Sequence, residues 1–464
     1  MSARFTVRDV SAALGRAPER ESAPEHAFER VMIDSRRTAR GDLFVAIRGE
    51  RFDGSAFLAR AVAAGATGAV GEDRPFDGRD GIVFWPVPDG RRALQALAGY
   101  HRRRQDARVV AVTGSNGKKT TKELVAAVLA QRFRTAATQG NLNNQVGVPL
   151  TLLEIGIRDE WAVVELGMNR PGEIAPLAAI TRPDIGVITN VAASHLEGMG
   201  TIDAVLEEKL SLGRALGSDG LLVYCGDQPM LAAAAGNLPC RRLSSGLAPG
   251  NDLTPDKWSL DEEGRGSFTL EGRTFRLRLA GRHNIVNALA AVAVGRVAGL
   301  SPGAIAVGIA EPDTLPLRMQ LERWGEVVAL VDCYNANPES VLSAAATLAT
   351  LSGVRRRVAV LGEMLELGSG SAALHRAVGG DLAGAGIDLV VVVGEGAAPI
   401  ADGALRAGLA CERFAGHDQA ARWLIENLEP GDAILFKASR GAALEEVVGV
   451  VRGACLNGSP AGGR

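Results

Sequence analysis

The sequence predicts an α/β protein of three domains built on parallel β-sheets, and three observations lead to this expectation. The chain has 464 residues, which at roughly 150 residues per domain is more than a single hydrophobic core organises. Apolar strand-like runs alternate with helix-like stretches throughout the chain, which is typical of parallel sheets covered by helices. A glycine-rich loop also joins one of these strands to the helix that follows it.

The alternation is clearest in the middle of the chain. In order, we expect a strand at Val109–Thr113, a helix at Lys118–Gln131, a strand at Trp161–Leu166, a helix at Ala175–Ile180 and a strand at Ile185–Thr189. The strand-like runs are short and almost wholly apolar, as expected of strands that are buried on both faces.

Two breaks divide the chain into domains. The segment Tyr100–Arg108 is basic and poorly periodic and precedes the first strongly apolar strand, so the first boundary is placed near Gln105. The proline-containing segment Glu311–Leu317 follows a long Ala/Val-rich helix, which places the second boundary near Pro312 and makes this segment a candidate hinge. The predicted domains are 1–105, 106–311 and 312–464, with a frayed tail from Asn457 onward.

Composition excludes several classes of protein. Hydrophobic residues make up 47% and charged residues 22% of the chain, and the formal net charge is -2, which describes a globular protein without attraction for nucleic acid. Apolar runs such as Leu389–Val393 are far shorter than the roughly 20 residues that cross a bilayer. The N-terminal region has no apolar block before a small-residue cleavage site, so we expect no membrane insertion and a cytoplasmic location.

A phosphate-binding loop is predicted between the strand at Val109–Thr113 and the next helix. The loop is Gly114, Ser115, Asn116, Gly117 and Lys118, and Lys119 and Thr120 open the helix. Glycines let backbone N–H groups approach phosphates, the helix N-terminus adds partial positive charge, and Lys118 can reach the β and γ oxygens of ATP. Lys119 stands where a hydroxyl normally binds Mg²⁺, and an ammonium has no lone pair to donate. The alternative is a glycine-rich turn with a solvated lysine.

Two further residues suggest a magnesium site. Glu165 ends the expected strand at Trp161–Leu166, and His195 follows the expected strand at Ile185–Thr189. Ligands bind at the carboxyl ends of strands in open α/β sheets, so both side chains are expected near the phosphate loop. His195 alone is equally explained as an ordinary loop histidine.

Together these motifs resemble the Mur ligases, and the similarity extends across nearly the whole chain. The motifs are Asp34-Ser35-Arg36, Gly41–Gly49, Phe52-Asp53-Gly54, Gly114–Lys118, Glu165–Asn169, Ile188–Gly198, Gly281–Ala291, Asp332–Pro338, Leu361–Gly368 and Lys437–Arg440. The resemblance implies an N-terminal UDP-binding α/β domain, a central P-loop ATPase-like parallel-sheet domain and a C-terminal Rossmann-like α/β domain.

The resemblance also implies roles for individual residues. Lys118, Glu165, His195 and Lys209 would be catalytic, with Glu165, His195 and a carbamylated Lys209 as metal ligands. The ATP site would add Asn287, Arg318 and Asp332 to the loop from Gly114 to Thr120, the UDP group would contact Ser35 and Arg36, and the acceptor would contact Tyr334, Asn335, Asn337, Lys437, Ser439 and Arg440. The cluster Glu207-Glu208-Lys209 has an alternative interpretation as a solvated helical face, and Ser211 replaces an acidic residue of the family.

The implied function is ATP- and Mg²⁺-dependent ligation of D-alanyl-D-alanine to UDP-N-acetylmuramoyl-tripeptide, a step of peptidoglycan synthesis that serves cell-wall biogenesis, cell shape and cell division. Its expected partners are these two substrates, and the chain is expected to be a monomer. One alternative is the ligase that adds the third peptide residue, or a folylpolyglutamate synthetase, and the run Tyr334–Pro338 argues against each. Another is a catalytically degenerate nucleotide-binding regulator, which Lys119 and Ser211 would suggest.

Overall fold

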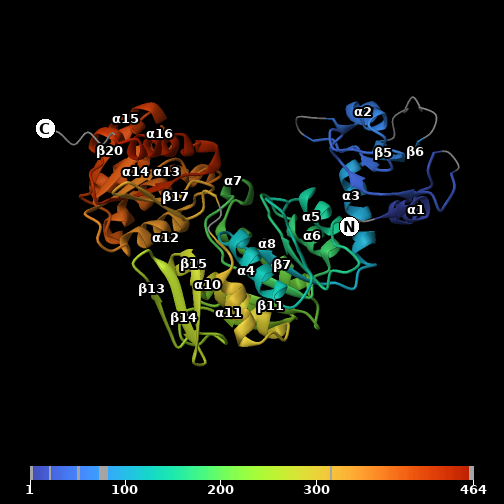
Figure 1. Cartoon of the computed structure of the whole chain (residues 1–464), viewed down its shortest axis with the longest axis horizontal. Helices are drawn as coiled ribbons and strands as arrows, with labels where there is room; N and C mark the ends of the chain where they lie inside the picture. The colour runs from blue at the N-terminus through green and yellow to red at the C-terminus, as the bar shows by residue number, and fades with distance from the viewer. Residues whose placement is uncertain (1–3, 20–21, 50–52, 73–81, 314–315, 459–464) are drawn as a thin grey trace.

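The chain forms three α/β domains, and the central one lies between the other two (Figure 1). The computed structural model describes residues 4–19, 22–49, 53–72, 82–313 and 316–458. Each of the three domains contains a mainly parallel sheet, so the predicted fold class is confirmed. Phe52 of the N-terminal motif, residues 314–315 of the expected hinge and residues 459–464 of the expected tail lie outside the described residues.

The N-terminal domain contains a small parallel sheet and an antiparallel strand pair. Its elements are β1 (Phe5–Thr6), α1 (Val7–Leu14), β2 (Ala27–Phe28), β3 (Val31–Met32), β4 (Leu43–Val45), the 3-10 turn η1 (Gly54–Phe57), α2 (Leu58–Ala63), β5 (Gly68–Glu72), β6 (Val83–Val87) and α3 (Gly90–Arg102). The parallel sheet has the order β3-β4-β5-β6, and β1 pairs with β2. Gly68 begins β5 directly against the Phe28 ring, where a Cβ would lie 2.4 Å from a ring carbon.

The central domain is built on an all-parallel sheet with the order β12-β11-β10-β7-β9-β8. Its elements are β7 (Arg108–Thr113), α4 (Lys118–Ala130), β8 (Thr135–Ala137), α5 (Gly147–Leu153), β9 (Trp161–Glu165), α6 (Ile174–Thr181), β10 (Ile185–Ile188), α7 (Leu196–Met199), α8 (Ile202–Ala215), β11 (Leu221–Cys225), α9 (Pro229–Ala235) and β12 (Arg241–Ser245). The apolar residues of β7 are fully buried, because helices cover both faces of the sheet.

A second, antiparallel sheet completes the central domain and is absent from the parallel pattern that the sequence predicts. It consists of β13 (Lys257–Leu260), β14 (Arg265–Leu270) and β15 (Arg273–Ala280), followed by α10 (Arg282–Val297) and α11 (Pro302–Ala310). The two-residue turn Glu271-Gly272 joins β14 to β15 with both residues at positive φ, 51° and 77°, as the twist of a tight hairpin requires. Phe268 and Phe275 stack across the hairpin with ring centroids 4.9 Å apart.

The C-terminal domain is a parallel sheet with one antiparallel edge strand, in the order β16-β17-β21-β18-β19-β20. Its elements are β16 (Gln320–Trp324), β17 (Val327–Asp332), α12 (Pro338–Ala349), β18 (Arg356–Leu361), η2 (Gly368–Gly370), α13 (Ser371–Asp381), η3 (Leu382–Ala385), β19 (Leu389–Val393), α14 (Ala398–Arg406), β20 (Ala410–Phe414), α15 (His417–Asn427), β21 (Asp432–Lys437), η4 (Arg440–Ala442) and α16 (Glu445–Leu456). The apolar strand β19 lies inside this sheet, and no helix in the described part of the chain is long and apolar enough to span a bilayer.

The basic segment Tyr100–Arg108 is more ordered than the sequence suggests. Helix α3 continues to Arg102 and packs against α5 and α6 of the central domain. The buried Arg102 side chain donates from Nε to the carbonyl oxygen of Thr181 at 2.9 Å, at the end of α6. Poor periodicity here is therefore not the mark of a loose linker, because Arg102 binds carbonyl groups of the neighbouring domain. The boundary placed near Gln105 falls in the short connection between α3 and β7.

The two larger parallel sheets each bring three neighbouring strand ends to the same region. In the central sheet the order β10-β7-β9 places the loops after these strands side by side. In the C-terminal sheet the order β17-β21-β18 does the same. Residues from both sets of strand ends line one cavity of about 1400 Å³. The carboxyl ends of the two sheets therefore form the opposite walls of one candidate site.

Candidate active site

The phosphate loop between β7 and α4 is shaped by two glycines at positive φ. Gly114 has a φ of 154°, and a Cβ there would lie 1.8 Å from Oγ1 of Thr189. Gly117 has a φ of 77°, and a Cβ there would lie 2.6 Å from Oδ1 of Asn287. Neither position admits a side chain, so the glycines are required for the loop to pack against β10 and α10.

Polar contacts fix the loop to the chain that follows β10. The backbone N–H of Ser115 donates to the carbonyl oxygen of Asn190 at 3.0 Å, and that of Asn116 donates to Oδ1 of Asn190 at 2.8 Å. The buried Ser115 hydroxyl accepts from the backbone N–H of Ala192 at 2.9 Å. Ser115 therefore fastens the loop through its hydroxyl, and its contact with the nucleotide stays a prediction.

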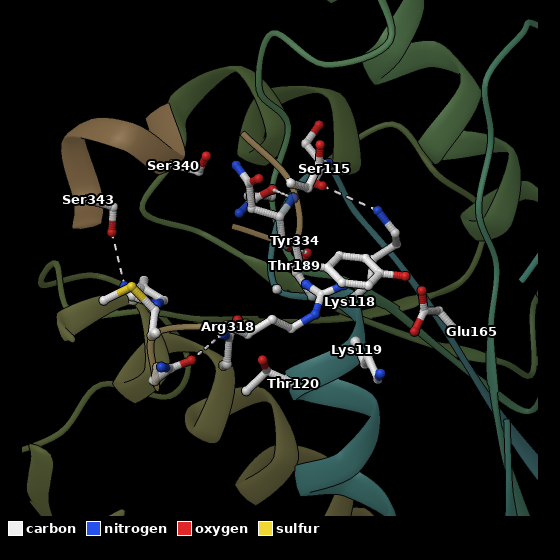
Figure 2. Close-up of a pocket in the computed structure, with 18 of the residues that line it drawn as sticks. Ser115, Lys118, Lys119, Thr120, Glu165, Thr189, Arg318, Tyr334, Ser340 and Ser343 are labelled. Carbon is white, nitrogen blue, oxygen red and sulfur yellow. Dashed lines mark hydrogen bonds between the residues drawn. The ribbon is translucent and has the colours of Figure 1, made fainter. Parts of the chain in front are cut away.

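The side chain of Lys118 lies back over its own loop (Figure 2). Its Nζ donates to the carbonyl oxygen of Gly114 at 2.7 Å and to that of Ser115 at 3.2 Å. Burial lowers the pKa of Lys118, Glu165 opposes this shift, and Arg318 adds to it. The ammonium group is thus held at the mouth of the loop, where phosphate oxygens would be bound.

Lys119 and Arg318 both lie close to one aromatic side chain, that of Tyr334. The guanidinium carbon of Arg318 is 4.0 Å from the Tyr334 ring centroid, and Nζ of Lys119 is 5.9 Å from it (Figure 2). Cations are attracted to the face of an aromatic ring at these distances. Lys119 and Thr120 both line the cavity, while the next hydroxyl, Oγ1 of Thr121, is fully buried and has no hydrogen-bond partner within the described ranges. Lys119 is therefore accommodated by an aromatic residue of the C-terminal domain.

Glu165 ends β9 beside the phosphate loop and is only 4% exposed. Its Oε1 accepts from Nδ2 of Asn143 at 2.8 Å, and its backbone N–H donates to Oγ1 of Thr138 at 3.0 Å. Oε2 is buried and has no hydrogen-bond partner in the part of the chain that the structure describes. A buried carboxylate oxygen without a partner is costly, so Glu165 fits a role as a cation ligand.

His195 begins α7 and points to the C-terminal domain. Its Nδ1 lies 2.5 Å from Oε2 of Glu366, although the geometry is not that of a well-aligned hydrogen bond. The interaction with His195 lowers the pKa of the Glu366 carboxyl. In the described residues, no group of three or more His, Cys, Asp and Glu side chains is arranged to hold a metal, so Glu165 and His195 would need other ligands beside them.

Lys209 is fully buried in α8, which differs from a solvated charged face. Burial lowers its pKa well below the ordinary value, Lys118 adds to this shift, and Glu208 opposes it. Glu208 is also buried and accepts from the backbone N–H groups of Gly172 and Ile174 at 2.7 and 2.6 Å, where α6 begins. The solvated interpretation is therefore wrong for both residues and holds for Glu207, which pairs with Arg214 on the surface.

On the opposite wall, Asp332 and Lys437 form a pair between neighbouring strands. They end β17 and β21 in register, and Nζ of Lys437 donates to Oδ2 of Asp332 at 2.6 Å. The same ammonium donates to the carbonyl oxygen of Asn335 at 3.0 Å. Lys437 is almost completely buried, and the Asp332 carboxylate balances its charge. The hydrogen bond from Lys437 to Asn335 holds the loop after β17 in place.

The remaining acceptor candidates are placed unequally. Tyr334 and Asn335 line the cavity. Asn337 is 2% exposed and caps α12, and its side-chain amide exchanges two hydrogen bonds with that of Asn116, at 2.8 and 3.2 Å. Ser439 is buried, and its hydroxyl accepts from the backbone N–H of Leu365 at 2.9 Å. Arg440 lies outside the cavity and pairs with Glu445 at 2.8 Å.

The nucleotide candidates on α10 also support one another. Nδ2 of Asn284 donates to the carbonyl oxygen of Ala280 at 2.7 Å, and Nδ2 of Asn287 donates to Oδ1 of Asn284 at 3.0 Å. Asn284 therefore bridges the end of β15 and the Asn287 side chain. Asn287 borders the phosphate loop at Gly117, so it lies where a nucleotide bound to that loop would extend.

The N-terminal candidates lie apart from this cavity. Ser35 and Arg36 are absent from its lining, and the exposed Arg36 guanidinium binds the Asp34 carboxylate with an N–O distance of 2.8 Å. The hydrogen bond from Arg36 lowers the pKa of Asp34 to about 2. Asp34 therefore orients Arg36, and the UDP contacts of Ser35 and Arg36 stay predictions.

Family models match all three domains. The one described as Mur ligase middle domain matches residues 112–295, the one described as Mur ligase, glutamate ligase domain matches 317–440, and the one described as Mur ligase family, catalytic domain matches 28–102. The chain belongs to the Mur ligase family. The resemblance inferred from the motifs is thereby confirmed.

Individual relatives narrow the comparison within the Mur ligases. The UDP-N-acetylmuramoyl-tripeptide--D-alanyl-D-alanine ligase of Escherichia coli (strain K12) is 39% identical over 438 residues, which cover 91% of this chain and 93% of the relative. MurF from Acinetobacter baumannii superposes with a TM-score of 0.88 at 32% identity, covering 97% of this chain and 99% of that one. MurF from Thermotoga maritima, solved in complex with ADP, gives 0.82 at 28% identity, with 92% and 98% covered.

Sequence reasoning misses several residues that build the site of this Mur ligase. Asn143 and Thr138 hold Glu165, Glu366 reaches His195, and Ser343 of α12 lies 2.9 Å from Nδ1 of His283. The polar run around Asn143 is a usable signal, since amide side chains gather there just before a helix. The other partners come from distant segments, and no local pattern marks them.

Proposed function

We propose that this Mur ligase joins D-alanyl-D-alanine to UDP-N-acetylmuramoyl-tripeptide at the expense of ATP, giving the UDP-muramoyl-pentapeptide, ADP and phosphate. The observation that carries the proposal is the single cavity in which Lys118 and Glu165 on the central wall face Asp332 and Lys437 on the C-terminal wall. The names of the relatives that align over nearly the whole chain give the specific substrates. We therefore do not propose the alternative function, which is that of the ligase that adds the third peptide residue.

The chemistry follows from what an amide bond requires. An amine does not displace hydroxide from a carboxylate at a useful rate, so the terminal carboxylate of the tripeptide first attacks the γ-phosphorus of ATP. This step gives an acyl phosphate and ADP. The amine of D-alanyl-D-alanine then attacks the acyl carbon, the C–O bond to phosphate breaks, and the amine loses a proton. Lys118 would bind the phosphate oxygens that gain charge during the first step.

Magnesium is part of the proposal, and the chain offers groups that fit it. Glu165 presents a buried carboxylate oxygen to which no described residue donates a hydrogen bond, and His195 lines the same cavity. Mg²⁺ is often bound by one or two carboxylates together with substrate phosphates. It would stabilise the negative charge that develops on the transferred phosphoryl group. Lys119 does not contribute a ligand, because an ammonium has no lone pair.

Carbamylation of Lys209 is the second metal proposal. The amine is buried, and its lowered pKa favours the neutral form that reacts with CO₂. The neutral amine nitrogen forms a bond to the carbon of CO₂ and loses one proton, so that an uncharged amine becomes a carbamate with an anionic oxygen ligand. Incubation with ¹³C-labelled bicarbonate would give a carbamate carbon signal that is absent in Lys209→Met.

The substrate contacts form the third part of the proposal. Ser35 and Arg36 would bind the UDP group, while Tyr334 and Asn335 would contact the dipeptide from the cavity wall. The proposal also includes dipeptide contacts from Asn337, Ser439 and Arg440. These side chains would reach the dipeptide only after exchanging their present hydrogen bonds and ion pair. We also propose that the protein is a cytoplasmic monomer and that it serves cell-wall biogenesis, cell shape and cell division.

Phosphate release tests the proposed function. Purified protein would be given Mg-ATP and UDP-muramoyl-tripeptide, with and without D-alanyl-D-alanine, and with single amino acids as controls. We expect release that depends on the dipeptide, together with a product heavier by one dipeptide less one water. Folded protein that binds ATP but releases no phosphate with any acceptor would instead support the nucleotide-binding regulator.

A further inference from the structure

A loop of the C-terminal domain reaches His195, the proposed metal ligand of the central domain. This loop follows β18 and contains Glu366, whose Oε2 lies 2.5 Å from Nδ1 of His195. A second contact lies beside it, since the backbone N–H of Glu197 donates to the carbonyl oxygen of Glu366 at 3.0 Å. Glu366 therefore contacts the central domain twice, through its side chain at His195 and through its backbone at Glu197.

The backbone on both sides of this contact adopts conformations that L-residues seldom take. His195 has a φ of 55° and Glu366 a φ of 63°, both in the left-handed region. Such residues cost free energy and persist where the surrounding structure requires them, often at functional sites. Each turn aims its side chain at the other domain, and the cost on both sides indicates that the pairing is specific.

Gly368 allows the close approach of the two loops. Its φ is 66°, and a Cβ there would lie 3.3 Å from both the backbone nitrogen and the Cα of Glu197. Any side chain at this position would press on the loop that carries His195 and would also strain the backbone. The contact thus depends on the fit of two backbones and does not rest on one flexible side chain.

We infer that Glu366 is a positioning residue that holds the imidazole of His195 in the orientation needed to bind Mg²⁺, so that docking of the C-terminal domain completes the metal site. A ring nitrogen that binds a metal leaves the other nitrogen free to interact with a carboxylate, which fixes the ring and raises its basicity. Here Nδ1 faces Glu366, which leaves Nε2 for the cation. The inference rests on the proposed function, since it assumes that His195 is a ligand.

Metal affinity is the readout that separates this role from a purely structural one. Mn²⁺ would replace Mg²⁺ as the probe, and its binding to protein saturated with ADP would be measured by electron paramagnetic resonance. Loss of the carboxylate that orients a ligating histidine typically weakens metal affinity about 10- to 100-fold. We expect Glu366→Gln to weaken Mn²⁺ binding by that factor, and high metal concentration to restore kcat. Glu395→Gln, which removes an exposed carboxylate paired with Arg413 in the same domain, is the matched control.

A second variant keeps the carboxylate and disturbs only the docking. Gly368→Ala leaves Glu366 in place but separates the two loops, so it should also weaken Mn²⁺ binding while thermal unfolding shows a folded protein. Unchanged Mn²⁺ affinity in Glu366→Gln would overturn the inference, and so would tighter binding, which would mean that Glu366 masks His195. Wild-type protein that binds no Mn²⁺ and releases no phosphate would instead overturn the proposed function, and the inference with it.

Discussion

The two walls of the cavity are both formed by the carboxyl ends of parallel strands, but their polar side chains differ in how far they are paired within the protein. On the central wall, Oε2 of Glu165 has no hydrogen-bond partner among the described residues, and Lys118 is held by the carbonyl groups of its own loop. On the C-terminal wall, Lys437 is paired with Asp332, and Asn337 caps α12 while it binds Asn116. This difference indicates that the central wall carries the chemistry and that the C-terminal wall sets its geometry.

The largest expected effect is on the central wall. Lys118→Ala removes the ammonium that would stabilise the transferred phosphoryl group, and losses of this kind lower kcat by about 10²- to 10³-fold. Phosphate release under saturating substrates measures the effect. Lys257→Ala, at an exposed lysine of β13, should retain wild-type activity. Equal activity in all three proteins would contradict the division between the two walls.

The C-terminal wall should respond in stability. Asp332→Asn leaves the Lys437 charge almost completely buried without its partner, and breaking a buried pair in this way costs about 3 kcal/mol. Urea unfolding followed by fluorescence measures the loss. The exposed pair of Glu395 and Arg413 provides the comparison, where Glu395→Gln should cost less than about 1 kcal/mol. A similar loss of unfolding free energy in both variants would show that the pair of Asp332 and Lys437 stabilises the protein no more than an exposed pair does.

Between the walls, His283 should make stability depend on pH. Burial lowers its pKa to about 4, Asp332 opposes this shift, and Lys437 adds to it. The unfolded chain binds a proton near pH 6.5 and the folded chain does not, so stability is complete above pH 6.5 and falls as the pH drops toward 4. The expected loss is about 3 kcal/mol at pH 4. His283→Gln should remove this part of the slope, whereas the exposed His26 changed to Gln should leave it as it is.

The smallest effect is expected where the walls touch. Asn337→Ser keeps a side chain that caps α12 but loses the two amide hydrogen bonds to Asn116. Two ordinary hydrogen bonds near the phosphate loop suggest a KM for ATP raised by about 2- to 10-fold with little change in kcat. Steady-state kinetics beside an Asn427→Ser control measure it. A KM equal to that of the control would mean that Asn337 does not support the loop.

The sequence predicts the central wall better than the C-terminal one. The phosphate loop, β7, β9 and β10 are local patterns of apolar runs followed by glycine or polar residues, and all form where expected. The pair of Asp332 and Lys437 instead joins residues 105 positions apart in the chain. Only the pairing of β17 with β21 brings them together, and no spacing in the sequence encodes that neighbourhood.

Burial accounts for most of the remaining differences. Glu208 and Lys209 resemble a solvated helical face in sequence, yet both are buried because α8 packs against α6. Arg102 resembles part of a linker, yet it binds carbonyl groups at the end of α6. A charged residue gives no sign in the sequence of whether its partner is water or the backbone of a distant helix. The same limit hides Glu366 until the two domains are placed together.

The central claim is that the carboxylate of the UDP-linked tripeptide is activated at the central wall, and oxygen transfer tests it most directly. The terminal carboxylate would be labelled with ¹⁸O, and the phosphate released in the presence of D-alanyl-D-alanine would be analysed by mass spectrometry. Because the phosphate leaves with the oxygen that attacked ATP, the account predicts one ¹⁸O atom in each phosphate released. Phosphate that carries only oxygen from solvent water would mean that ATP is simply hydrolysed, and would contradict the account.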